Sequence, residues 1–419
     1  MGCMEIAHSP IHAPQHRPLE RSIDGGWPAV FALTLCVSTL IASEFMPVSL
    51  LTPIASGLQV SEGQAGQAIA VSGIFAVITS LFIASASRHL DRRILLLGLT
   101  TLMIISGAIV ASASNYLVFM AGRALLGVVI GGFWSMSTAT VMRLVPEDAV
   151  PRALALLNGG NALATTIAAP LGSYLGQYIG WRGAFFCVVP LAAATFAWLF
   201  TTLPSMPNRE RASGIAAFNV LRRPQVPLGM LAVALFFMGQ FALFTYLRPF
   251  LETVTAVDVT TLSLMLLGLG VAGLGGTYAI GIALKRSLHG LLISMPLAMA
   301  AIAGALVVLG HSPIGVAVLL ILWGLIGTAA PVAWWTWVSR VLPGEAEAGG
   351  GLMVAVVQLA ITLGAAVGGM LFDGRGYQAT FLSSAALLIS SALVAFLGAR
   401  TSHTAEGRAA DSNAATRAV

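Results

Sequence analysis

The stretch PSMPNRERASGIAAFNVLRRPQ, residues 204–225, is the longest polar break in a chain of 419 residues. The chain as a whole is apolar: 57% of its residues are hydrophobic and 9% are charged. Soluble domains are about 45–50% apolar and about 25% charged, so a soluble protein of this composition would expose much of its core. The composition therefore predicts a membrane protein with many transmembrane segments. Because the apolar runs are continuous rather than alternating, they argue against a β-barrel.

Six apolar runs precede this break and six follow it, and each is close to the roughly 20 residues that a helix needs to cross a bilayer. We therefore predict an all-α membrane protein of twelve transmembrane helices, with six-helix bundles over 27–203 and 226–399 joined by a cytoplasmic linker over 204–225. Residues 1–26 and 400–419 are predicted to be cytoplasmic tails. The expected runs are 28–50, 66–87, 94–112, 116–141, 153–178, 184–203, 226–250, 260–284, 290–309, 314–338, 347–371 and 378–398.

The basic residues predict how these helices are oriented, because cytoplasmic loops of membrane proteins carry an excess of Lys and Arg. With the amino terminus inside the cell, 17 of the 21 basic residues fall in cytoplasmic segments. The exceptions are Arg182, Arg248 and Arg375 outside, and Arg123 within a predicted span. The sequence thus predicts that both termini are cytoplasmic.

The two halves resemble each other at an offset of 196–197 residues. Glu44-Phe45 precedes Pro53 by the same interval as Gln240-Phe241 precedes Pro249. Parallel six-helix repeats are typical of transporters, whose substrate site lies between the halves near the middle of the membrane. Because the acid of the first half is an amide in the second, a proton site is expected in one half only. The other matched pairs are Gly127 with Gly324, Arg143 with Arg340, Pro146 with Pro343, and Asn161 with Gln358.

The loop between the second and third predicted spans reads Arg88-His-Leu-Asp91-Arg92-Arg93, and the fourth and fifth spans contain Arg123-Ala-Leu-Leu-Gly127 and Ala169-Pro170-Leu-Gly172. These strings resemble the loop motif, the arginine motif and the antiporter motif of the major facilitator superfamily. The loop departs from its motif because Arg88 stands where the motif has an aspartate, and the antiporter motif has Ala169 in place of its first glycine. The resemblance implies that Asp91, Arg92 and Arg93 in the loop, and Pro170 and Gly172 in the antiporter motif, take part in conformational change.

Longer strings of the chain are Glu44-Phe-Met-Pro-Val-Ser-Leu-Leu-Thr-Pro53, Gly131-Gly-Phe-Trp-Ser135, Met142-Arg-Leu-Val-Pro146, Ala169-Pro-Leu-Gly-Ser173, Gly239-Gln-Phe-Ala242 and Tyr246-Leu-Arg-Pro249. They resemble the bacterial purine ribonucleoside efflux pumps, which belong to the drug:proton antiporter branch of that superfamily. The resemblance covers about residues 27–400 and implies proton-driven export of inosine, adenosine, guanosine and purine analogues. We expect a monomeric secondary transporter of the bacterial inner membrane, which uses a proton gradient and no cofactor. Export of sugars or of hydrophobic drugs remains the alternative.

Glu44 and Arg123 are the acid and the base that fall inside predicted spans. A charged side chain at the centre of a transmembrane helix costs about 2.5–3.5 kcal/mol to insert, so such residues are usually functional. A carboxyl in a low-dielectric cavity suits the uptake and release of a proton, and Arg123 could pair with Glu44 as it titrates. The alternatives are a neutral structural carboxyl and an arginine whose side chain reaches the outer headgroups.

Amides within spans are the candidate substrate ligands, because purine bases and ribose hydroxyls need hydrogen-bond partners. Asn158 and Asn161 share a face of the fifth span, Gln358 lies in the eleventh span, and Gln240 aligns with Glu44. The alternative is hydrogen bonding between helices, which is worth about 0.6 kcal/mol for each bond.

Aromatic side chains could stack on a purine, an interaction worth about 1–3 kcal/mol per base on nucleic-acid platforms. The alternative for each of them is packing or contact with lipid. The candidates are Phe45, Phe133, Trp134, Tyr246, Trp334 and Trp335.

Other functions lack support in the sequence, which contains no Walker motif, no His-Glu-x-x-His and no Gly-x-Ser-x-Gly. An ATP-driven pump and a membrane-embedded enzyme are therefore not expected. We expect neither a metal site nor a nucleic-acid partner, but a small molecule, protons and the lipid bilayer.

Overall fold

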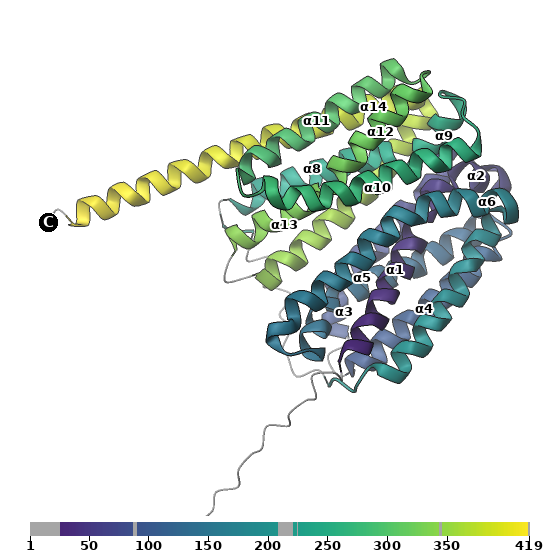
Figure 1. The fold of residues 1–419 in the computed structure, drawn as a ribbon, viewed down its shortest axis with the longest axis horizontal. Coiled ribbons are helices and arrows are strands. Elements are labelled where there is room, and N and C mark those ends of the chain that lie inside the picture. The colour runs from purple at the N-terminus through teal and green to yellow at the C-terminus, as the bar shows by residue number, and fades with distance from the viewer. Residues whose placement is uncertain (1–25, 87–89, 208–220, 224, 343–345, 418–419) are drawn as a thin grey trace, which may run out of the picture.

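The structure is a computed structural model that describes residues 26–86, 90–207, 221–223, 225–342 and 346–417 (Figure 1). Its side chains are described over the same ranges, except for residues 84–86, 346–348 and 401–417. Arg88 of the loop motif and Pro343 of the sequence repeat lie outside the described residues, as do residues 1–25 of the predicted amino-terminal tail.

All regular structure in the described ranges is helical, as predicted. The first half consists of α1 (Trp27–Ser49), α2 (Leu51–Leu58), α3 (Glu62–Ala86), α4 (Arg92–Ala111), α5 (Tyr116–Leu144), a 3-10 turn (Glu147–Ala149) and α6 (Val150–Thr202). The second half consists of α8 (Val226–Phe244), α9 (Leu247–Thr253), α10 (Val259–Ala283), α11 (Leu288–Leu309), α12 (Pro313–Gly327), α13 (Ala330–Val341) and α14 (Ala346–Arg417).

The described chain contains ten helical segments that are long and apolar enough to cross a membrane, and two of these are twice the usual length. The backbone turns back within α6 at Gly180 (φ 70°) and within α14 at Gly376 (φ 77°). Their ψ angles are 167° and −179°, and this combination of positive φ with extended ψ is essentially open to glycine alone, so each glycine ends one crossing and begins the next. Counting each double helix as two crossings gives the predicted twelve. The two glycines are themselves 196 residues apart, which is the offset of the sequence repeat.

The two halves are separate bundles that lie side by side (Figure 1). Where they meet, α3 packs against α14, and α6 packs against α10. We call the end of the molecule that carries α2 and α9 the distal end, and the end at which α1 begins the proximal end. Beyond the bundle, α14 continues as a helix over most of the predicted carboxy-terminal tail (Figure 1).

Buried apolar side chains form one large core in the second half and two smaller cores in the first half. The second-half core includes Val48, Ile69 and Ala169 from the first half, and a first-half core includes Tyr246 from the second. The apolar packing is therefore continuous across the halves, and the helices that hold the site residues are fixed against one another there.

Candidate functional site

Glu44 lies in α1, and its side chain is 6% exposed. Three residues further along, Pro47 stands inside the same helix. Proline has no backbone N–H, so the carbonyl of Ser43, four residues before Pro47, loses its usual helical partner. A buried carbonyl without a partner is costly, and a donor from elsewhere has to satisfy it.

Arg123 of α5 supplies that donor, and its side chain is fully buried. Its Nη1 donates to the carbonyl of Ser43 (2.8 Å) and its Nη2 to the carbonyl of Glu44 (3.1 Å). Further bonds run from Nη2 to the hydroxyl of Ser72 (3.1 Å) and from Nε to the carbonyl of Ala68 (3.3 Å). Arg123 therefore ties α1 to α3 and does not reach the headgroups. It binds the backbone of Glu44 rather than its carboxyl, although the two charges interact electrostatically.

The carboxyl of Glu44 makes a side-chain hydrogen bond with Gln358 of α14. This bond crosses from the first half to the second. Beside it, the rings of Phe45 and Phe241 stack across the same boundary, with their centroids 5.8 Å apart. Phe45 and Phe241 are equivalent in the sequence repeat, so their contact places the pseudo-twofold axis between them. Glu44 thus lies next to this axis, at the boundary between the halves.

The second half does not reproduce this arrangement. Gln240, the equivalent of Glu44, directs its Nε2 to the carbonyl of Gly327 at 3.5 Å. That carbonyl is left free by Pro331, four residues later, where α12 ends and α13 begins. The Oε1 atom of Gln240 is buried and has no hydrogen-bond partner within the described part of the chain. Gln240 thus donates to a carbonyl at the break between α12 and α13 in its own half. Its predicted contact with substrate stays a prediction.

The asparagines of the fifth span make contacts within their own helix. Asn158 is exposed and donates to the carbonyl of Leu154 at 2.9 Å. Asn161 is half-buried, and its backbone carbonyl accepts the hydroxyl of Thr165 at 2.8 Å. The structure brings Gln358 to Glu44, but it shows no hydrogen bond from the Asn161 side chain to another described residue, so the paired role of the two amides stays a prediction.

The aromatic candidates are dispersed. Phe45 is at the boundary beside Glu44, whereas Phe133 packs edge-on against the half-buried Trp134 at 6.1 Å within the first half. Trp334 is buried in the second-half core, and Trp335, one residue later, is 46% exposed. No two of the six candidates other than Phe133 and Trp134 are in ring contact among the described residues. Stacking on a substrate stays a prediction for all six.

Tyr246 lies at the distal end of α8 and is fully buried. Its hydroxyl donates to the carbonyl of Ala365 at 2.7 Å, and its ring stacks on Phe372 at 5.3 Å. A Cβ atom added to Gly66 of the first half would lie 2.2 Å from the Tyr246 hydroxyl oxygen. Tyr246 therefore closes the space between the halves at the distal end in this conformation.

The loop motif lies at the proximal end and holds the first half together. Asp91 caps α4 by accepting the N–H of Arg93 (2.8 Å), and it also accepts the N–H of Met206 (2.8 Å) and the hydroxyl of Ser205. Burial alone would raise the pKa of Asp91. The bonds from Ser205, Met206 and Arg93, together with the charge of Arg93, lower it below the usual value. The Arg93 Nη2 donates to the carbonyl of Phe200 at 2.8 Å, and the N–H of Arg92 donates to the carbonyl of Met206 at 3.1 Å.

The antiporter motif lies in α6 where it meets α1 and the second half. Pro170 and Gly172 are both buried in α6. A Cβ atom at Gly172 would lie 2.6 Å from the Ser49 hydroxyl, so the glycine allows α1 and α6 to approach closely. The next residue, Ser173, accepts a hydrogen bond from Arg248 of the second half at 3.4 Å. This motif thus adjoins a contact between the halves.

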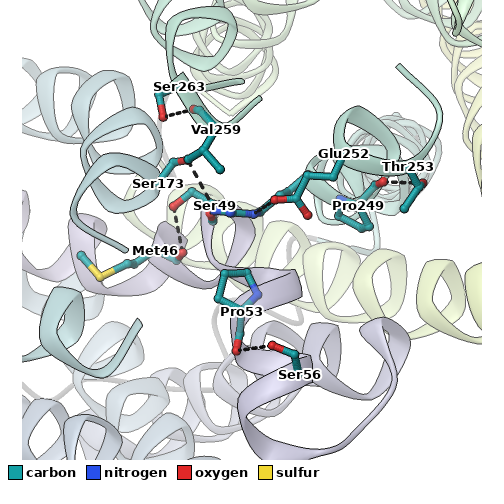
Figure 2. A network of polar contacts seen from close by, with 11 residues as sticks. Met46, Ser49, Pro53, Ser56, Ser173, Pro249, Glu252, Thr253, Val259 and Ser263 are labelled. Carbon is teal, nitrogen blue, oxygen red and sulfur yellow. Dashed lines mark hydrogen bonds and ion pairs between the residues drawn. The ribbon is translucent and has the colours of Figure 1, made fainter. Parts of the chain in front are cut away.

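Sequence reasoning missed how strongly Arg248 is held. It counted Arg248 among the basic residues outside the membrane, but the residue is 4% exposed and donates to the carbonyl of Ser49 in the first half (Figure 2). A usable signal was present, because Pro53 stands four residues after Ser49 and frees that carbonyl. Pro47 and Pro53, within and just after the first predicted span, thus each free a carbonyl that a long polar side chain from another helix satisfies.

Two six-helix bundles related by a sequence repeat, with a buried carboxyl and an amide joined across their boundary, define a secondary transporter rather than an enzyme. The sequence profile of the family described as the Major Facilitator Superfamily matches residues 31–361. The chain belongs to this superfamily and is a multi-pass membrane protein.

Curated relatives cover nearly all of the chain. The purine ribonucleoside efflux pump NepI of Salmonella paratyphi B is 42% identical over 88% of this chain and 93% of its own length. A protein of Pseudomonas aeruginosa named transcription regulatory protein OpdE is 61% identical over 90% of this chain and 95% of its own length. The chain is therefore an efflux transporter of this superfamily.

A solved structure with the same fold is that of a bacterial homologue of the human lysosomal transporter Spinster, in an inward-facing and unoccupied conformation. The two structures superpose with a TM-score of 0.75 at 17% sequence identity, over 91% of this chain and 98% of that chain. At this identity the likeness establishes the fold alone.

Proposed function

We propose that this chain is a proton-coupled antiporter that exports purine ribonucleosides and purine analogues across the bacterial inner membrane. It works as a monomer, with both termini and the proximal end in the cytoplasm. The observation that carries this proposal is the buried Glu44 carboxyl, held at the boundary of the halves and hydrogen-bonded to Gln358 of the opposite half. A titratable group in this position can make the fit between the halves depend on a proton.

The proposed cycle uses Glu44 as the proton carrier. When the distal end is open to the outside, Glu44 takes up a proton, and when the proximal end is open it releases that proton to the cytoplasm. One proton thus moves inward down its gradient while the nucleoside moves outward. Because the Gln358 amide bonds the Glu44 carboxyl, a nucleoside that needs this amide competes with Glu44 for it. That competition is our proposed link between substrate binding and the proton.

The substrate class rests on the resemblance to the efflux pump NepI, which is 42% identical to this chain. The name of OpdE describes transcription regulation in that protein. A regulator that reads DNA uses a folded domain outside the membrane with a basic surface. The described ranges of this chain consist of transmembrane bundles with their short connections, which favours transport as its primary activity.

Uptake of labelled inosine into inverted membrane vesicles tests the proposal, because export by the cell becomes uptake in this orientation. We expect uptake to depend on an acidic vesicle lumen and to stop when a protonophore collapses the gradient. An excess of unlabelled adenosine or guanosine should compete, whereas sugars should not. Competition by a sugar but not by a nucleoside would favour sugar efflux. Uptake at the same rate with and without the proton gradient would contradict proton coupling.

A further inference from the structure

Arg248 fastens the second half to the end of a first-half helix. Its Nη1 donates to the carbonyl of Ser49, the last residue of α1, and lies 3.4 Å from the hydroxyl of Ser173 in α6 (Figure 2). Ser49 has no helical donor for this carbonyl because Pro53 occupies the position four residues later. The guanidinium therefore satisfies a carbonyl that the first half cannot satisfy by itself.

Arg248 also carries its own counter-ion. Its Nε bonds the carboxylate of Glu252 at 2.8 Å, one turn further along in α9 (Figure 2). Because Glu252 belongs to the same short helix, it stays with Arg248 if the halves separate. Arg248 can then leave Ser49 without exposing an uncompensated charge to the membrane. The pair thus suits a contact that is made and broken repeatedly.

Asp373 of α14 makes a matching contact between the halves at the same end of the molecule. It accepts the N–H of Gly63 at 2.9 Å and the hydroxyl of Ser61, and so caps the amino end of α3 in the first half. A Cβ atom at Gly63 would lie 2.3 Å from the Asp373 carboxylate, so a glycine is needed for the carboxylate to come this close. The amino end of α3 is therefore capped twice, by the Ser61 hydroxyl of its own half, which accepts the N–H of Gln64 at 3.0 Å, and by Asp373 of the opposite half.

The two contacts have opposite charges, and each sign matches the helix end that it binds. A cation lies at the carboxyl end of α1, where the helix dipole is negative, and an anion lies at the amino end of α3, where it is positive. Both contacts join the halves, and both lie at the distal end. Because a transporter of this architecture must open each end in turn, both contacts must break when the distal end opens.

We propose that Arg248 and Asp373 form the distal gate, two contacts that hold the distal end shut by capping first-half helices from the second half. Both residues can be hydrated when the gate opens, so the contacts stabilise the closed state selectively. This inference uses the alternating opening of the halves that the proposed function also uses, but it does not depend on the substrate or on the proton.

Distances between spin labels in a cysteine-free background test the gate. One label pair at Ser114 and His311 reports on the distal end, and another pair at Glu147 and Lys285 reports on the proximal end; all four residues are exposed. In the gate variants R248Q and D373A, we expect a new population of molecules in which the distal labels are farther apart and the proximal labels are closer together. A coupling of ordinary size would change the ratio of open to closed molecules about 5- to 150-fold.

The chain offers a matched control for each variant. Arg182 is also distal and caps the carbonyl of Ala113 at 2.9 Å, but within the first half, so R182Q should leave both distances unchanged. Asp258 is a distal acid that caps its own helix α10, so D258A should also leave them unchanged. The milder variant S61A removes one donor to Asp373 together with the acceptor of the Gln64 N–H, and it should move the distal distance in the same direction by a smaller amount.

Unchanged distances in R248Q, D373A and S61A would overturn the proposal, and so would equal changes in the two control variants. If R248Q fails to fold, D373A and S61A still decide the question. Because the measurement is made without substrate or a proton gradient, a failure of the proposed function would leave its outcome unaffected.

Discussion

Glu44 makes one contact through its backbone and another through its side chain, and the two contacts reach different halves of the molecule. Its backbone carbonyl is held by Arg123 within the first half, while its carboxyl bonds Gln358 in the second half. The position of α1 is therefore fixed independently of the proton on the carboxyl. A change in that proton then alters the boundary between the halves rather than the packing of the first bundle.

Replacing Glu44 with glutamine mimics the protonated carboxyl and keeps the side-chain size. We expect E44Q to abolish uptake of inosine driven by a proton gradient, because no proton can be taken up or released. Binding of inosine, measured by calorimetry on purified protein, should survive because the Gln358 amide remains in place. Gradient-driven uptake by E44Q at the wild-type rate would contradict the role of Glu44 as the proton carrier.

Gln358 and Asn161 are equivalent in the repeat, but among the described residues Gln358 contacts Glu44 and Asn161 is not seen to do so. Substitutions at the two positions can therefore separate substrate binding from coupling to the Glu44 carboxyl. Removing a partner from a buried hydrogen bond costs about 1–3 kcal/mol, so Q358A and N161A should each weaken inosine binding about 5- to 150-fold. A carboxyl that loses a hydrogen-bond donor takes up a proton more readily. The pH of half-maximal uptake should therefore move upward in Q358A and stay unchanged in N161A.

A ligand that lacks the ribose hydroxyls provides the control for these two variants. Its transport should suffer less than that of inosine if the amides bind the nucleoside. Equal losses for every ligand would indicate that the amides only pack helices together, and an unchanged pH profile in Q358A would contradict its coupling to Glu44.

At the scale of elements, three prolines each leave a helix carbonyl without its usual donor, and a polar side chain from another helix binds that carbonyl. Ser43, Ser49 and Gly327 each precede a proline by four residues, and each carbonyl receives a long polar side chain. The donors are Arg123, Arg248 and Gln240. A proline thus opens a place in the helix ladder that another helix can fill, and in this way it fixes the register between two helices.

A double-mutant cycle tests this dependence in α1. R123A leaves the carbonyls of Ser43 and Glu44 without their donor, and an unsatisfied buried group costs about 1–3 kcal/mol. P47A restores an N–H that can bond Ser43, so the loss in the double variant should be smaller than the sum of the single losses by about 0.5–3 kcal/mol. Thermal unfolding in detergent would measure these losses.

Pro190 supplies the control because it lies inside the second crossing of α6 and is exposed. The effects of R123A and P190A should add. A P47A/R123A pair that is as additive as P190A/R123A would show that Arg123 does not serve the carbonyl that Pro47 frees.

Asp91 gives a prediction about the proximal end of the first half. Its pKa is lower in the folded protein than in the unfolded chain, because Ser205, Met206 and Arg93 bond the ionised form. Its contribution to stability is therefore fully present above the unfolded pKa and is lost as the pH falls through the folded pKa. The difference in melting temperature between wild type and D91N should be present at pH 7 and shrink toward pH 3. A constant difference would contradict this assignment.

The sequence predicted the elements better than their connections. Composition, apolar runs and basic residues gave twelve crossings in two halves, because each of these signals follows from a single helix in a bilayer. The break of α12 at Gly327 and the end of α8 at Phe244 were not predicted, since both lie inside runs that stay apolar throughout. For the site, the sequence identified Glu44 and Gln358 separately. Their contact depends on how two helices are packed whose residues 44 and 358 are 314 positions apart in the chain, and no local sequence pattern determines that packing.

At the scale of the whole molecule, the halves share a fold but contribute different side chains to the boundary between them. Phe45 and Phe241 meet at the pseudo-twofold axis, as a symmetric pair should. Beside them the symmetry fails: Glu44 reaches across the boundary to Gln358, whereas Gln240 turns into its own half. Under the proposed function, titration of this one carboxyl would act on the boundary from the side of the first half.

The orientation of the molecule is the last prediction, and it rests on the placement of 17 of 21 basic residues on one side. In a variant without Cys3, Cys36 and Cys187, single cysteines at exposed Ser114 and His311 would report on the distal end. A membrane-impermeant maleimide that is added on the outer side should label both cysteines while the inner membrane is intact.

Cysteines at Glu147 and Lys285 would report on the proximal end and should be labelled only after the membrane is broken. Ser114 follows three crossings and His311 follows nine, so a miscounted crossing between them would place these two sites on opposite sides. Labelling of all four in the reverse order would instead keep the fold and invert the protein. Glu44 would then meet the outside from the proximal end, and the gate formed by Arg248 and Asp373 would close the cytoplasmic entrance.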